Sequence, residues 1–123
     1  MPELDVTLKD AMQIEGAVGV ALVDYTSGMA LGSAGGNRDL DMDVAAAGNT
    51  DVIRAKLRAM EMLKIKEPIE DILVTLGVQY HLIRPVTGRN GKGLFLYLVL
   101  QKSRANLAMA RRQLRLIEET LDL

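Results

Sequence analysis

Apolar and polar positions recur at helical spacing from residue 42 to residue 65, and this pattern predicts one long helix. Asp41 or Asp43 can cap the first backbone N–H groups, and Pro68 prevents the helix from continuing. One apolar stripe along this helix contains Val44, Gly48, Val52, Ala55, Ala59 and Met62. A second apolar stripe contains Met42, Ala46, Ile53, Leu57 and Met60.

The two stripes together cover about twice the arc of about 100° that a surface helix needs to reach its core. We therefore expect the helix to be buried on two sides. One side can lie on the chain's own sheet, and the other side indicates a partner. The alternative is a helix enclosed between two layers of one domain.

Shorter apolar runs predict the remaining elements. Five strands are expected at residues 17–24, 29–33, 69–76, 78–86 and 94–102, with further helices at 3–14 and 104–121. The first and last strands are apolar on both faces, so they should lie at the centre of the sheet with helices on both sides. Gly28 and the pair Asn90-Gly91 favour tight hairpins between neighbouring strands.

These elements predict an α/β fold of the α+β kind, formed as one domain over residues 1–123. A five-stranded antiparallel sheet lies between the long helix on one face and the two terminal helices on the other.

Composition excludes several kinds of chemistry. The chain is 49% hydrophobic but only 3% aromatic, it has no cysteine, and its one histidine is His81. Disulfides, thiolate metal sites and histidine clusters within one chain are therefore excluded. Neither glycine-rich segment has the Lys-Ser or Lys-Thr of a phosphate-binding loop. We expect no catalytic, cofactor or metal site, and we interpret His81 as a packed or edge residue.

Charge and hydropathy place further limits on partners. The net charge is −1, with acids in excess in the first half and bases in the second, which permits charge-steered association with a partner. There is no basic excess with stacking aromatics, so nucleic acid is not expected as a partner. The longest apolar runs have seven residues, too few to insert across a membrane, and the acidic N-terminus is unlike a secretory signal. A cytoplasmic location is expected.

The chain from about Leu4 to Leu121 resembles the roadblock/dynein light chain domains, which have a profilin-like three-layer sandwich. The resemblance begins with IEGAVGVALVD at residues 14–24, followed by Ser27-Gly28. It continues through the Ala-rich long helix, the segments ILVTLG, YHLIRPV and LFLYLVLQ, and the Leu-rich closing helix. The chain departs from the family at Glu15-Gly16-Ala17, where Pro-Gly-Val is frequent, although Gly16 keeps the turn.

This resemblance implies a homodimer. The strand that follows the long helix would pair with its copy, and the two long helices would pack side by side. The expected dimer interface contains Ala46, Ile53, Leu57, Met60, Ile72 and Val74.

The resemblance also implies a function. Members of the family bind small Ras-like GTPases or act as adaptors in larger assemblies, without being enzymes themselves. The expected partner-binding residues are Asp51, Arg54, Arg58 and Glu61, on the polar side of the long helix. A rival surface carries Arg104, Arg111 and Arg115.

The arginines of the chain leave one catalytic role open. Arg54, Arg58 and Arg84 are interpreted as surface bases, any of which could stimulate GTP hydrolysis in trans. Two other functions stay open, namely a small-molecule sensor and a structural scaffold subunit of a larger assembly.

Overall fold

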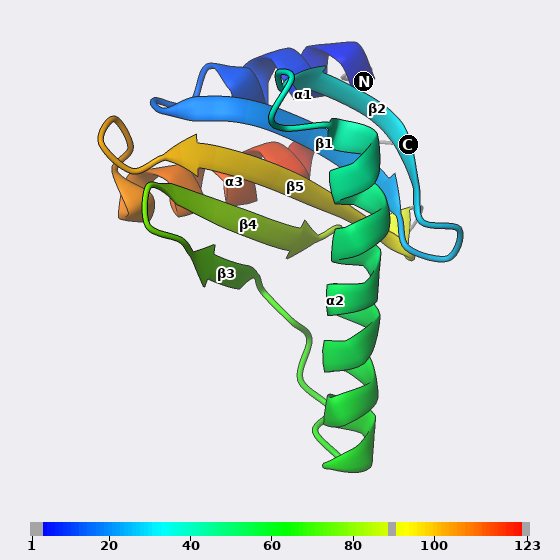
Figure 1. The fold of residues 1–123 in the computed structure, drawn as a ribbon. Coiled ribbons are helices and arrows are strands. Elements are labelled where there is room, and N and C mark those ends of the chain that lie inside the picture. Colours follow the sequence, from blue (N-terminus) through cyan, green and yellow to red (C-terminus); the bar gives the residue numbers. More distant parts are fainter. Residues whose placement is uncertain (1–3, 89–90, 122–123) are drawn as a thin grey trace.

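The computed structural model describes residues 4–88 and 91–121, and Figure 1 shows how their helices and strands are arranged. The element order is α1 (Leu4–Met12), β1 (Ala17–Asp24), β2 (Met29–Gly35), α2 (Met42–Met62), β3 (Ile72–Thr75), β4 (Gln79–Pro85), β5 (Leu94–Gln101) and α3 (Leu107–Thr120). The strands form one antiparallel sheet in the order β2-β1-β5-β4-β3. The predicted fold class is confirmed. Within the described residues, no helix has the length and apolar character required to cross a bilayer.

The sheet separates two apolar layers. Helix α2 lies against one face, and α1 and α3 lie against the other (Figure 1). Side chains of β1 and β5 alternate between the layers, so Leu22 and Leu96 pack towards α1 and α3 while Val23 and Phe95 pack towards α2. Burial on both faces explains why these two strands are continuously apolar and occupy the middle of the sheet.

Two elements begin three residues later than the sequence predicts. Strand β3 starts at Ile72 rather than at residue 69, because only residues from Ile72 onwards pair with β4. Helix α3 starts at Leu107 rather than at residue 104, because the Asn106 side chain caps it by accepting a hydrogen bond from the Met109 N–H at 3.1 Å. In the hairpin expected between β4 and β5, Asn90 lies outside the described residues, while Gly28 in the first hairpin has the expected positive φ of 82°.

Both ends of α2 are set by local hydrogen bonds. Asp41 caps the start, since its carboxylate accepts from the N–H groups of Asp43 at 2.9 Å and Val44 at 3.2 Å. At the other end the Ile65 N–H donates back to the Met60 carbonyl, and Lys64 adopts a positive φ of 58°. This is the Schellman geometry, in which the residue after the cap is usually glycine.

Helix α2 is only partly supported by the sheet. Its first half lies against β1 and β2, whereas its second half extends past the sheet (Figure 1). Two apolar residues of that second half are exposed, Leu57 at 38% and Met62 at 75%. The half of α2 that extends past the sheet is part of the candidate interaction surface.

Candidate interaction surface

The two apolar stripes of α2 have different surroundings. Ala46 and Ile53 are fully buried in the layer between α2 and the sheet, and Met60 is 9% exposed near the end of the helix. The structure therefore places these three predicted interface residues in the chain's own core, where they offer a partner almost no surface. Leu57 lies on the same side but is partly exposed, and it lines hollows beside α2.

The other stripe faces outwards. Val44 is 68% exposed, and Val52 is also exposed. A methyl group added at Gly48 would meet nothing within 4 Å, so this glycine faces open space and does not touch the sheet. The exposed stripe, which contains Val44, Gly48, Val52, Ala55, Ala59 and Met62, is therefore an apolar helix face whose small residues allow another backbone to approach closely.

Strand β3 provides a second surface without a partner in the chain's described residues. It pairs with β4 on one side, and on its other side no described strand pairs with it. Ile72 and Val74 point to the α2 side of the sheet, and beyond them Leu76 and Val78 are exposed. An apolar edge strand with open backbone N–H and C=O groups is a template for pairing with another strand.

A polar pair lies on the α2 side of the sheet. The Tyr97 hydroxyl is 2.8 Å from His81 Nδ1, and His81 Nε2 is 3.0 Å from Gln79 Oε1. Burial lowers the pKa of His81, so its ring is neutral at pH 7. The Gln79 oxygen can only accept, so Nε2 carries the proton and Nδ1 accepts from the Tyr97 hydroxyl. With both nitrogens satisfied, the ring is a packed polar group.

The predicted partner-binding residues are all exposed on α2. Asp51, Arg58 and Glu61 form no ion pair within the described residues. Arg54 differs, because its Nη2 donates to the Thr26 carbonyl in the β1–β2 turn at 2.7 Å. Arg54 is therefore tied to its own chain, and Arg58 is the less restrained of the two bases.

The structure corrects one surface assignment. Arg84 is only 8% exposed, and its Nε donates to Glu118 Oε1 at 3.0 Å. It faces α3, where the alternation of β4 between buried faces places it. Arg84 is therefore a buried, paired residue and not a surface base.

An apolar hollow lies between α2 and the segment that leads to β3. Its volume is about 400 Å³, and it is lined by Tyr25, Ile53, Leu57, Pro68, Ile69, Pro85, Val86 and Thr87. A small-molecule site of this size needs several convergent polar groups to orient its ligand. This lining offers only two side-chain hydroxyls, and that of Thr87 already donates to Glu118. The hollow therefore does not support a sensor function.

Comparisons with solved structures identify the fold. A roadblock/LC7 domain from Streptomyces avermitilis superposes with a TM-score of 0.81 at 13% identity, over 97% of this chain and 94% of that one. The chain has the roadblock/LC7 fold. Myxococcus xanthus MglB gives a TM-score of 0.74 at 18% identity over 92% and 77% of the two chains. A structure described as MglB with tetrameric arrangement gives 0.66 at 15% identity over 92% and 85%.

No protein-family model and no curated protein matches the chain. The roadblock/LC7 fold is therefore established by the arrangement of helices and strands, at identities that leave most surface residues different.

Proposed function

We propose that this chain is a homodimeric, non-catalytic interaction module that binds a small Ras-like GTPase and regulates it or acts as its adaptor. The observation that carries the proposal is the combination of two unfinished apolar surfaces in a roadblock/LC7 fold. One is the exposed stripe of α2, and the other is the open edge of β3.

A second copy would complete both surfaces at once. If β3 pairs with its copy, the two sheets continue as one, and the two α2 helices come to lie side by side across the junction. The small residues Gly48, Ala55 and Ala59 permit close helix contact. Of the interface residues expected from sequence, Leu57, Ile72 and Val74 keep exposed surface for this role, and the exposed stripe takes the place of the others.

The dimer is tested by placing a charge in the exposed stripe. Val52→Asp would bury an unpaired carboxylate against the second copy, at a cost of several kcal/mol. Light scattering should give the wild type twice the mass of the 13.4 kDa chain, and the variant the mass of one chain. Circular dichroism should show the same helix content in both, because Val52 lies outside the chain's own core.

Met109→Asp is the matched control, since Met109 is an exposed apolar residue on α3, outside the exposed stripe and β3. It should remain dimeric. A monomeric wild type, or a Val52→Asp dimer of unchanged stability, would contradict the proposed interface.

Regulation of a GTPase requires a polar docking surface beside the dimer junction. Asp51, Arg54, Arg58 and Glu61 provide it, since they are exposed on α2 next to the exposed stripe. Mixed charge suits a partner with complementary groups rather than a uniform polyanion. Arg58 is the residue best placed to reach a bound nucleotide in trans, because no ion pair within the described residues restrains it.

The docking surface is tested by charge reversal. Arg54→Glu with Arg58→Glu should weaken binding to a GTP-loaded Ras-like GTPase from the same genome at least tenfold, or about 1.4 kcal/mol. Binding is measured by calorimetry, and association should slow with added salt because exposed charges are screened within about 10 Å at 0.1 M. Single-turnover GTP hydrolysis with and without the wild-type chain measures any stimulation.

Arg104→Glu with Arg115→Glu is the matched pair on the rival surface, and it should bind as the wild type does. Loss of binding in this pair, with full binding by the first pair, would move the docking surface to the closing helix.

A further inference from the structure

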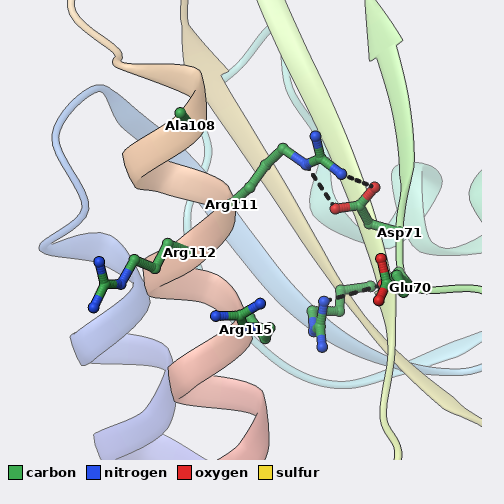
Figure 2. A pocket seen from close by; sticks show the side chains of 7 residues that line it. Glu70, Asp71, Ala108, Arg111, Arg112 and Arg115 are labelled. Carbon is green, nitrogen blue, oxygen red and sulfur yellow. Dashed lines mark hydrogen bonds and ion pairs between the residues drawn. The ribbon is translucent and has the colours of Figure 1, made fainter.

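A depression of about 250 Å³ lies between α3 and the start of β3, on the face of the sheet opposite α2 (Figure 2). We call it the arginine depression. Four arginines and two acids line it: Arg84, Arg111, Arg112, Arg115, Glu70 and Asp71. These residues come from three parts of the chain, and the sequence analysis recognised only Arg111 and Arg115 as a shared face.

Two of the four guanidinium groups are held in place. Arg84 donates from Nε to Glu118 at 3.0 Å and from Nη1 to the Glu70 carbonyl at 3.2 Å. Arg111 reaches from α3 to Asp71 and donates to both carboxylate oxygens, at 2.8 and 3.0 Å (Figure 2). Each guanidinium has five N–H donors, so both retain donors for a further acceptor after these bonds are made.

The other two arginines leave the depression with excess positive charge. Arg115 forms an ion pair with Glu119 at 3.9 Å, but both side chains are more than half exposed, so solvent screens the pair, and Arg112 has no ion pair within the described residues. The charges of Arg84 and Arg111 are balanced by Glu118 and Asp71. The lining itself has four arginines and two carboxylates, and of these carboxylates Glu70 forms no ion pair within the described residues.

We propose that the arginine depression binds a phosphate group. A phosphate monoester presents several acceptor oxygens and nearly two negative charges, which match planar guanidinium groups that donate in pairs. A carboxylate ligand would bring only one negative charge beside Glu70. The volume is smaller than the 300–1,000 Å³ of sites for whole drug-sized ligands, so the site accommodates the phosphate and leaves its carrier outside.

The position of the depression allows the phosphate group to belong to a bulky molecule, which we call its carrier. Ala108 lies in the first turn of α3 and lines the depression with only a methyl group, so access from that side is open (Figure 2). The carrier is either a small phosphorylated molecule or a phosphorylated side chain of a protein. All residues of the site belong to one chain, so a second copy is not needed to form it.

The test is an NMR titration of the isotope-labelled full chain with sodium phosphate and with phenyl phosphate, at constant ionic strength. Amide signals of residues 70–71 and 108–115 should shift saturably, and sodium acetate should not reproduce the shifts. Arg112→Gln with Arg115→Gln should weaken binding at least about tenfold. Arg104→Gln, which removes the same kind of charge outside the depression, should leave the affinity unchanged.

A second pair of variants tests the opposite change, an increase in the affinity for phosphate. Glu70→Gln removes a negative charge from the lining and should strengthen phosphate binding several-fold. Glu67→Gln makes the same change on an exposed residue outside the depression and should have no effect. Shifts spread over all basic surfaces, or equal effects of Arg104→Gln and the Arg112/Arg115 variant, would overturn the site.

A short peptide with one phosphoserine distinguishes the two carriers. At least tenfold tighter binding than phenyl phosphate identifies a phosphorylated protein as the ligand, and equal or weaker binding identifies a small molecule. If none of the three phosphate probes binds, the inference is overturned.

Discussion

At the scale of single residues, Glu118 shows how this aliphatic core accommodates a charge. Its side chain is 1% exposed, between α3 and the sheet. One carboxylate oxygen accepts from Arg84 Nε, and the other accepts from the Thr87 N–H at 3.1 Å and the Thr87 hydroxyl at 2.9 Å. The charge is therefore paired and its hydrogen bonds are satisfied, which is the condition for burying an ion at tolerable cost.

Removing one partner of this pair should be strongly destabilising. Glu118→Ala leaves Arg84 buried without its counter-charge, and we expect the free energy of unfolding to fall by about 3–5 kcal/mol. Urea denaturation at fixed protein concentration measures the change. Glu119→Ala removes an exposed acid from the next position and should change stability by about 0.5 kcal/mol or less.

The double variant Arg84→Met with Glu118→Leu should recover most of the loss, because it leaves neither charge unpaired. A small effect of Glu118→Ala would mean that water, rather than Glu118, solvates Arg84.

The pairing of Arg84 with Glu118 could have been suspected from sequence. Arg84 alternates with Leu82 and Val86 on a face that must be buried, and Glu118 follows Leu114 by one helical turn. Both charges therefore occupy positions where an apolar residue is expected. Sequence does not show that the two positions meet, because they lie 34 residues apart and belong to different elements.

At the scale of elements, the end of α2 contains an unusual residue. Lys64 occupies the left-handed region, where a side chain costs roughly 1–2 kcal/mol relative to glycine. The hydrogen bonds from Lys64 to the Glu61 carbonyl and from Ile65 to the Met60 carbonyl hold this conformation.

Lys64→Gly should stabilise the protein by about 0.5–1 kcal/mol, because relief of the strained φ exceeds the extra entropy that glycine gives the unfolded chain. Thermal unfolding followed by circular dichroism measures it. Lys66→Gly is the matched control two residues later, where φ is not positive, and it should be neutral or destabilising. A loss of stability in Lys64→Gly equal to that in the control would show that Lys64 is not strained.

Element type was easier to predict than element boundaries. Strand β1 is recovered from its apolar run without error, because burial on both faces leaves no other pattern. The start of β3 was predicted three residues early, since the sequence does not reveal where pairing with β4 begins. The start of α3 was also early, because the pattern did not distinguish Asn106 as the cap from Arg104 as the first helical residue.

At the scale of the whole molecule, periodicity showed two apolar stripes on α2 but not which one faces the sheet. Both are apolar, and the choice depends on how the helix rotates against β1 and β2. The stripe with the larger residues Met42 and Ile53 fills the layer, and the stripe with Gly48 and Ala55 remains outside. The arginine depression was unpredictable for a related reason, since it joins Asp71 to Arg111 across 40 residues.

The pairing of β1 with β5 has a consequence for the time course of synthesis. Strand β5 begins at Leu94, about seventy residues after β1 ends at Asp24, so a ribosome that adds roughly 5–20 residues per second makes it about 4–14 seconds later. Throughout that interval one edge of β1 has no neighbour, although residues 20–23 become fully buried in the finished protein. We therefore expect the nascent hairpin to expose apolar surface of the kind that chaperones bind, until the last strand to be made closes the sheet at its centre.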